Sequence, residues 1–312
     1  MNKADQLKLG GPSQIPKASP ETLLAGLEAV RGKGTSPWKL SWVRFIRNKV
    51  AVTGLVALAI ILLAITLAPI LARYVPTNID SNSIRVPPGA AHLFGTDDLG
   101  RDVFSRVLWG GRETLRVGFL GVLIAISGGV FLGMLSAYTG GWVDALVQRL
   151  IEIMLAFPVI LLLLSIIAIL GSGLPTVLFA LGISNIPWYA RLVRGSVLST
   201  KTMDYINATR ALGAGDWRIM FIHILPNIIS PILIYGTLEL GYAIMTTAGL
   251  SYIGLGAQPP SPEWGAMLNY GRNYLRDSWW MSVFPGLGVF ISVFSVNLVG
   301  EGLRDALDPK TR

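Results

Sequence analysis

The chain has 312 residues, of which 52% are hydrophobic and 14% are charged, with a formal net charge of +8 and no cysteine. A soluble domain of this length carries about a quarter charged residues. The composition therefore indicates an integral membrane protein. The lack of cysteine excludes disulfides, thiolate catalysis and cysteine-ligated metals in this chain.

Six apolar runs follow along the chain, each close to the length of about 20 residues that crosses a bilayer as a helix. The expected spans are 50–71, 115–138, 146–170, 175–189, 228–248 and 283–299. The fourth run is expected to continue as helix through "ARLVRGSVL". The runs are continuous rather than alternating, which favours helices over a membrane barrel. The sequence therefore predicts an all-α integral membrane protein with six transmembrane helices.

Lysine and arginine near the ends of these runs predict the orientation in the membrane. Basic residues gather before the first run, after the fourth and after the sixth; examples are Arg44, Arg194 and Arg304. An even number of spans puts these three segments, and both termini, in the cytoplasm. The segment 73–112 also carries arginines, and the alternating count puts it outside. The net charge then reflects topology, and no aromatic-interleaved basic patch indicates a nucleic-acid partner.

These boundaries divide the chain into four parts. Residues 1–45 are expected to form a cytoplasmic tail, with a short amphipathic helix in "SPETLLAGLEAVRG" capped by Ser19. This polar leader is too long for the start of a secretory signal. Residues 46–112 hold the first span and an extracytoplasmic segment, 113–305 a core of five helices, and 306–312 a cytoplasmic tail.

The sequence lacks the residue patterns of known catalytic and nucleotide-binding sites. The stretch "RGKGTS" lacks the glycine spacing of a phosphate-binding loop, and Gly34 stands where Ser or Thr should follow Lys33. The two histidines, His92 and His223, are assigned to opposite sides of the membrane, and each is expected to be an ordinary surface or interfacial residue. The sequence therefore predicts no catalytic residue and no metal or cofactor bound by this chain.

A polar, basic stretch, "NATRALGAGDWRIMFIHILPN", interrupts the apolar runs. Helical spacing predicts a short helix over 205–212, and Gly213 suits its C-terminal stop. Asp216 is placed to cap a second helix, which Pro226 should end at the membrane. The expected apolar stripe of this second helix consists of Trp217, Met220, Phe221 and Ile224. Such a compact helical turn can fit into a groove on another protein.

This stretch resembles the "EAA…G…I-LP" signature with which permease subunits of bacterial ABC importers dock on their ATPase. Ala208, Gly213, Leu225 and Pro226 match, whereas Asn207 replaces the usual Glu, Thr209 the second Ala, and His223 a common Ile. The resemblance implies a coupling helix at about 203–224. The residues it assigns to ATPase coupling are Asn207, Ala208, Thr209, Arg210, Leu212, Gly213, Asp216, Arg218 and Pro226.

The stretches "HLFGTDDLGRDVFSRVLWGGR" and "AGLSYIGLGAQPPSPEWGAML" resemble the second permease of the dipeptide/oligopeptide family. This resemblance implies a type I ABC importer permease fold in the bacterial cytoplasmic membrane. It implies four kinds of partner: a homologous second permease, two ATPase subunits that carry ATP and Mg, an extracytoplasmic substrate-binding protein and membrane lipid. The implied cargo is di- or oligopeptides; nickel, glutathione or a glycoside are the alternatives, and a secondary transporter is the disfavoured one.

Further residues are singled out by position. Glu239 lies in the fifth run, either as a satisfied structural carboxylate or on the translocation path. Trp264 and Arg272 belong to an aromatic belt or to an outer rim that receives the binding protein. "GRDVFSRVLWGGR" is expected to lie on the outer membrane surface as an amphipathic helix, with Arg106 on its polar face.

Helix packing and local pairing are also predicted. Gly129 and Gly133 should permit close helix packing. Pro158 and Pro187 can kink the third and fourth helices. Arg149 and Glu152 are spaced for an ion pair.

Overall fold

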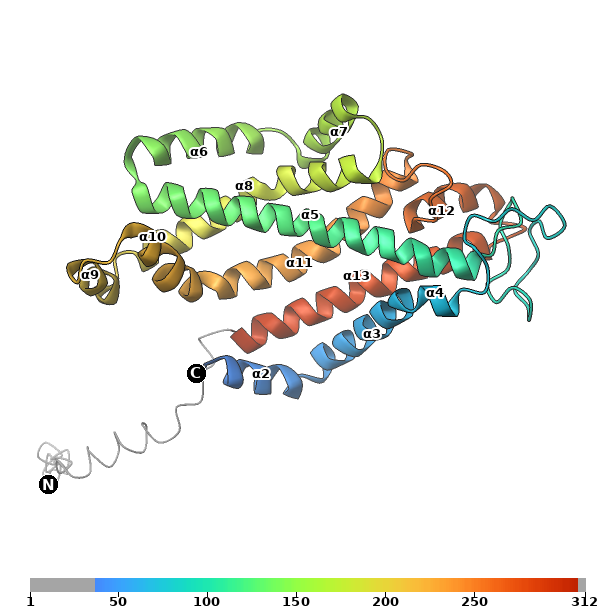
Figure 1. The fold of residues 1–312 in the computed structure, drawn as a ribbon, viewed down its shortest axis with the longest axis horizontal. Helices are drawn as coiled ribbons and strands as arrows, with labels where there is room; N and C mark the ends of the chain where they lie inside the picture. The colour runs from blue at the N-terminus through green and yellow to red at the C-terminus, as the bar shows by residue number, and fades with distance from the viewer. Residues whose placement is uncertain (1–36, 308–312) are drawn as a thin grey trace, which may run out of the picture. The chain divides into compact units, whose positions relative to one another are not determined.

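The computed structural model describes residues 37–307, and this part of the chain is helical apart from loops and one isolated bridge between Thr96 and Asp102 (Figure 1). The elements are α2 (Pro37–Arg47), α3 (Lys49–Thr66), α4 (Ala68–Leu71), α5 (Val103–Thr139), α6 (Gly141–Leu155), α7 (Val159–Leu170), α8 (Leu174–Thr200), α9 (Asp204–Ala211), α10 (Asp216–Arg218), the π-helix η1 (Ile219–Ile224), α11 (Leu225–Tyr252), α12 (Trp264–Gly271), the 3₁₀ turn η2 (Arg272–Tyr274) and α13 (Trp280–Leu307). The all-α prediction is confirmed. The helix expected after Ser19 lies outside the described residues.

Four helical stretches within the described residues are long and apolar enough to cross a membrane: α3, α5, Asp216–Tyr252 and α13. A fifth span arises if α6 and α7 are counted together, although the two are bent by 90° at their break. Pro158 stands at that break and begins α7, so the expected kink in the third helix is a sharp corner. α8 is a continuous helix of 27 residues, but the polar residues Asn185, Arg191 and Arg194 interrupt its apolar sequence. The count of six spans therefore stays a prediction.

α5 is one unbroken helix of 37 residues. The helix expected over 100–112 is present from Val103 onward, but it forms the first turns of α5 rather than a separate helix. Asp102 caps this helix by accepting a hydrogen bond from the backbone N–H of Ser105 at 2.8 Å. Arg106 is 1% exposed rather than on a polar face, because its guanidinium lies 3.5 Å from the carboxylate of Asp97.

Small residues set the distance between α5 and α8, which run side by side (Figure 1). A Cβ added at Gly129 would lie 2.2 Å from Cβ of Tyr189, and one at Gly133 would lie 2.5 Å from the carbonyl oxygen of Ala190. The predicted close approach through these two glycines is confirmed. The predicted ion pair of Arg149 with Glu152 is also present, at 3.2 Å on an exposed helix face.

The two ends of the bundle carry different structures. α9 and α10 lie at one end, whereas the 72–102 segment and α12 lie at the opposite end (Figure 1). An apolar cluster that includes Ile65, Val103, Trp264 and Trp280 fills the second end. The two candidate sites from the sequence therefore fall at opposite ends of one helical bundle.

Candidate functional site

The exposed turn between α9 and α10 carries the residues that the sequence assigned to ATPase coupling. α9 ends at Ala211, and Gly213 then adopts φ 83°, a left-handed conformation that favours glycine. Leu212 at the tip is 89% exposed. Because a Cβ at Gly213 would meet nothing within 4 Å, the backbone conformation alone accounts for the glycine. We call residues 204–226 the coupling turn.

The second half of the coupling turn differs from the prediction at two residues. Pro226 does not end a helix: it occupies the first turn of α11, and the six-residue π-helix η1 joins α10 to α11 without a break. This position suits proline because the first turn of a helix needs no backbone N–H donor. Asp216 does not cap α10 either, since Gly215 holds the N-cap position. The Asp216 carboxylate instead accepts a hydrogen bond from the Tyr138 hydroxyl at 2.7 Å.

An apolar core fixes the coupling turn to the bundle. Four of its side chains are at most 4% exposed, and they pack against buried residues of three long helices. These four are Ile206, Ile219, Met220 and Ile224, and their neighbours are Met134 and Ala137 of α5, Val193 and Val197 of α8, and Ile228 and Ile232 of α11. The turn is therefore a packed part of the fold rather than a free loop.

The outward face of the coupling turn gathers the predicted coupling residues. Eight of the nine are exposed, and Thr209 is half-buried with its hydroxyl donating to the carbonyl of Tyr205 at 2.7 Å. Trp217 and Phe221, which were expected on the apolar stripe with Met220 and Ile224, are 60% and 41% exposed and stack at 5.6 Å. The helical spacing of these four apolar residues does not indicate that two of them face outward.

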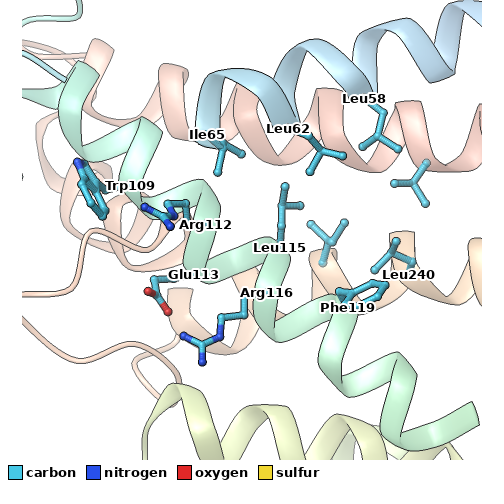
Figure 2. A pocket seen from close by; sticks show the side chains of 12 residues that line it. Leu58, Leu62, Ile65, Trp109, Arg112, Glu113, Leu115, Arg116, Phe119 and Leu240 are labelled. Carbon is cyan, nitrogen blue, oxygen red and sulfur yellow. The ribbon is translucent and has the colours of Figure 1, made fainter. Parts of the chain in front are cut away.

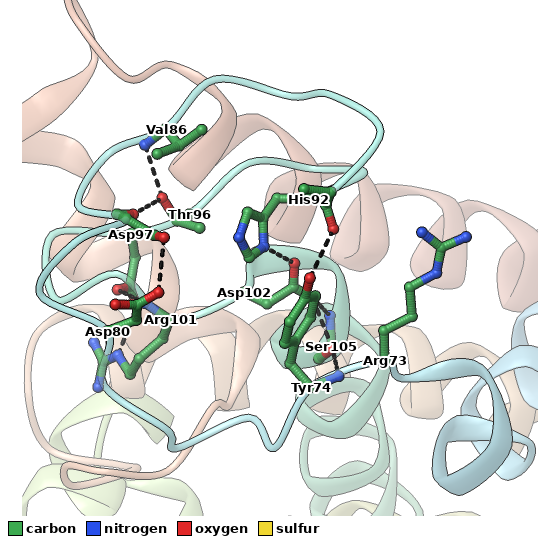
Figure 3. Close-up of polar contacts among 12 residues, drawn as sticks. Arg73, Tyr74, Asp80, Val86, His92, Thr96, Asp97, Arg101, Asp102 and Ser105 are labelled. Atoms are coloured by element: carbon green, nitrogen blue, oxygen red, sulfur yellow. Dashed lines mark hydrogen bonds and ion pairs between the residues drawn. The ribbon is translucent and has the colours of Figure 1, made fainter.

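Polar contacts organise the opposite end of the bundle (Figure 3). Arg101 donates from Nε to the carboxylate of Asp97 at 2.7 Å, and both side chains are buried. His92 pairs through Nδ1 with Asp102 at 2.9 Å and stacks on Tyr74 at 4.8 Å. His92 is thus a partly buried structural partner of the residue that caps α5. Buried charges are stable only when paired in this manner.

The two rim candidates separate in the structure. Trp264 is 2% exposed, and its indole N–H donates to the carbonyl of Val107 at 2.8 Å. It packs against Gly110, Gly111 and Gly288, where little room remains for a Cβ. This burial removes the Trp264 side chain from an outer rim. Arg272 is exposed, and its guanidinium lies 5.5 Å from the centroid of the Tyr252 ring. Arg272 therefore stays a candidate for the outer rim.

Glu263, next to Trp264, is a buried carboxylate that sequence analysis missed. It accepts hydrogen bonds from the Thr114 hydroxyl at 2.8 Å and from the backbone N–H of Ala266 at 2.9 Å, and thereby caps α12. Burial raises the pKa of Glu263, and these hydrogen bonds act in the opposite direction. The acidic residue just before a helical run was the available signal for a cap.

A pocket of about 790 Å³ opens between α3, α5, α11 and α13. Figure 2 shows Leu58, Leu62 and Ile65 pointing from α3 toward α5. The lining also includes Trp109, Arg112, Glu113, Leu115, Arg116, Phe119, Leu240, Ile244 and Val296. The pocket is therefore apolar along α3, with its charged groups on the first half of α5.

Glu239 does not line this pocket, although its neighbour Leu240 does. Its side chain is 8% exposed, and its Oε1 has no hydrogen-bond partner within the described part of the chain. It lies within electrostatic range of Tyr189 on α8 and Tyr235 on α11. A place on the translocation path stays a prediction for Glu239.

The helical bundle and its apolar spans define a multi-pass membrane protein. Residues 129–312 match the family described as "Binding-protein-dependent transport system inner membrane component", and residues 36–88 match the "N-terminal TM domain of oligopeptide transport permease C". The chain belongs to this family of transport permeases of the inner membrane.

Several curated proteins resemble the chain over most of its length. A glutathione transport system permease protein GsiD of Pectobacterium atrosepticum is 43% identical over 94% of this chain and 98% of its own. A dipeptide transport system permease protein DppC of Alkalihalophilus pseudofirmus is 44% identical over 89% and 91%. A di/tripeptide transport system permease protein DppC of Pseudomonas aeruginosa is 41% identical over 89% and 93%.

Solved structures support the fold. A chain of the MetNI methionine ABC transporter in an inward-facing conformation aligns with a TM-score of 0.53 and 22% identity. The alignment covers 65% of this chain and 96% of that one. The chain therefore has the fold of a type I ABC importer permease.

Proposed function

We propose that this chain is one of two homologous permease subunits of an ATP-driven importer for small peptides. The relatives named for dipeptide, di/tripeptide and glutathione transport support this substrate class, because glutathione is itself a peptide. Nickel and glycosides have no such support among these relatives. A secondary transporter is disfavoured because the family depends on a binding protein.

In this proposal the chain changes conformation during transport, and the partner ATPase subunits hydrolyse the ATP. Two ATPase subunits bind ATP and Mg, and their closure carries the coupling turn and tilts the bundle toward an outward-open state. An extracytoplasmic binding protein delivers the peptide at the end that carries Arg272. The coupling turn is then cytoplasmic, together with both termini, and the 72–102 segment is extracytoplasmic. The four-part division at residues 45, 112 and 305 follows from this orientation.

One observation carries the proposal: Leu212 projects from a turn that is otherwise packed into the bundle. Its 89% exposure leaves an apolar side chain in water within the isolated chain. Trp217 and Phe221 add apolar surface nearby. Exposed apolar groups gathered in this way are typical of a protein interface. Asn207 stands where related permeases carry Glu, so this docking relies on shape and apolar contact.

The test uses the complete transporter, reconstituted in lipid with both permeases, the ATPases, the binding protein and alanylalanine. Leu212→Asp should lower peptide-stimulated ATP hydrolysis by about tenfold or more, because a buried leucine contributes about 1.5–3 kcal/mol and the new carboxylate resists burial. Since Leu212 is exposed, the subunit itself should fold normally. Thr202→Asp adds the same charge outside the tip and serves as the control.

Unchanged stimulation in Leu212→Asp, with normal assembly, would refute docking through the coupling turn. Uptake of radiolabelled alanylalanine and of glutathione by the same vesicles tests the cargo. Uptake of neither, in a complex whose ATPase responds normally to its binding protein, would refute the peptide assignment.

A further inference from the structure

A tyrosine at the end of α5 contacts both sides of the coupling turn. The Tyr138 hydroxyl donates to the Asp216 carboxylate of α10 at 2.7 Å. The guanidinium of Arg210, on α9, lies 5.9 Å from the centroid of the Tyr138 ring. Arg210 and Asp216 stand on either side of the exposed tip at Leu212 and Gly213. A helix that is distant in sequence therefore holds the turn from within.

The end of α5 is itself tied to two other helices. Arg194 of α8 donates two hydrogen bonds to Asp144 of α6, at 2.8 and 2.7 Å. Asp144 also accepts from the Ser136 hydroxyl of α5. Lys201, just after α8, donates to the carbonyl of Ala137 at 2.6 Å. A displacement applied at Tyr138 therefore reaches α5, α6 and α8 together.

The sharp connection between α5 and α6, just after Tyr138, also ties the end of α5 to α6. Gly140 and Gly141 adopt φ 70° and 56°, and a Cβ at either would meet nothing within 4 Å. These left-handed conformations turn the chain from α5 directly into α6. The covalent chain, by contrast, links the coupling turn only to α8 and α11. Tyr138 thus adds a polar contact to the apolar packing through which Met134 and Ala137 of α5 already touch the turn.

We propose that Tyr138 is a positioning residue that transmits the motion of the coupling turn to α5. This inference rests on the proposed function, because it takes the turn to be driven by the ATPases. The Asp216 carboxylate accepts a hydrogen bond from the Tyr138 hydroxyl, and Arg210 holds the ring by a cation–π contact. Losing these contacts leaves docking and the apolar packing intact, but it weakens the link through which α5 follows the turn.

The test is the number of ATP molecules hydrolysed per alanylalanine imported by the reconstituted transporter. Tyr138→Phe removes the hydroxyl and keeps the ring, and it should raise this ratio by about threefold, as expected for one solvent-accessible hydrogen bond to a charged group. Tyr138→Leu removes both contacts and should raise the ratio further. The control is Tyr74→Phe at the opposite end of the bundle, which removes an exposed hydroxyl that donates to the carbonyl of Ala91 at 3.2 Å. It should leave the ratio unchanged.

A native ratio in both Tyr138 variants would overturn the proposal. If Leu212→Asp still abolishes stimulation in the same preparations, the proposed function survives that failure. If Leu212→Asp also leaves stimulation unchanged, the role of Tyr138 and docking through the coupling turn are both refuted.

Because the native chain has no cysteine, a chemical link offers an independent readout. The double variant Tyr138→Cys, Asp216→Cys should be uncoupled, and joining the two thiols with a short bismaleimide should restore a low ratio. Restored coupling is not expected if Tyr138 only stabilises the fold. A link that stops import while ATP hydrolysis continues would show that α5 and the turn must separate, and would overturn the proposal.

Discussion

Gly129→Ala tests how tightly α5 and α8 must pack. The new Cβ would lie 2.2 Å from Cβ of Tyr189 and 2.9 Å from the backbone nitrogen of Ala190, whereas ordinary contacts begin at 3.4 Å. The two helices must therefore move apart by about 1 Å. Overpacking of this kind costs about 1–3 kcal/mol, and the better helix propensity of alanine offsets up to about 1 kcal/mol. We expect a net loss of about 1–2 kcal/mol in the free energy of unfolding.

For a chain of 312 residues, that loss lowers the melting temperature by about 1.5–3 °C. The assay is thermal unfolding of the purified subunit, followed by tryptophan fluorescence. Gly195→Ala in α8 is the matched control, because its Cβ would meet nothing within 4 Å. It should melt at or above the native temperature. Equal melting temperatures for the two variants would refute the argument from close packing.

Two further predictions concern buried carboxyls. Burial raises the pKa of Glu263 in the folded state, so the stability linked to this group is greatest at low pH and is lost as pH rises above the ordinary carboxyl range. Glu263→Gln should therefore flatten the fall in melting temperature as pH rises above the ordinary carboxyl range, and an unchanged pH profile contradicts this. If Glu239 is a structural carboxylate, as its burial inside the bundle favours, Glu239→Gln should assemble and import alanylalanine normally. Altered flux in a normally assembled transporter would place Glu239 on the path instead.

The sequence alone determined the helical class and the positions of the main elements. Continuous apolar runs admit little else in a bilayer, because unpaired backbone groups are costly there. α8, α11 and α13 each contain the run predicted for them and extend it by several residues. Gly213 marked the tip of the coupling turn because a left-handed residue is a local requirement.

Local patterns failed where a distant partner decides the outcome. Arg106 reads as the polar face of a surface helix, but Asp97 pairs with it and makes its burial possible. Trp264 reads as an interfacial aromatic, but the small residues Gly110, Gly111 and Gly288 leave a space that its ring fills. Neither partner is recognisable from the spacing around these two residues.

Only the tertiary structure placed Tyr138 beside Asp216, since 78 residues separate them in the chain. The tertiary structure also decided the angle of 90° between α6 and α7. Pro158 in the sequence indicates a kink but not its angle. The sequence therefore determined which segments are helical and which turn is exposed, because those depend on hydropathy and backbone freedom. The pairing of side chains between helices, on which coupling depends, followed from how the helices pack.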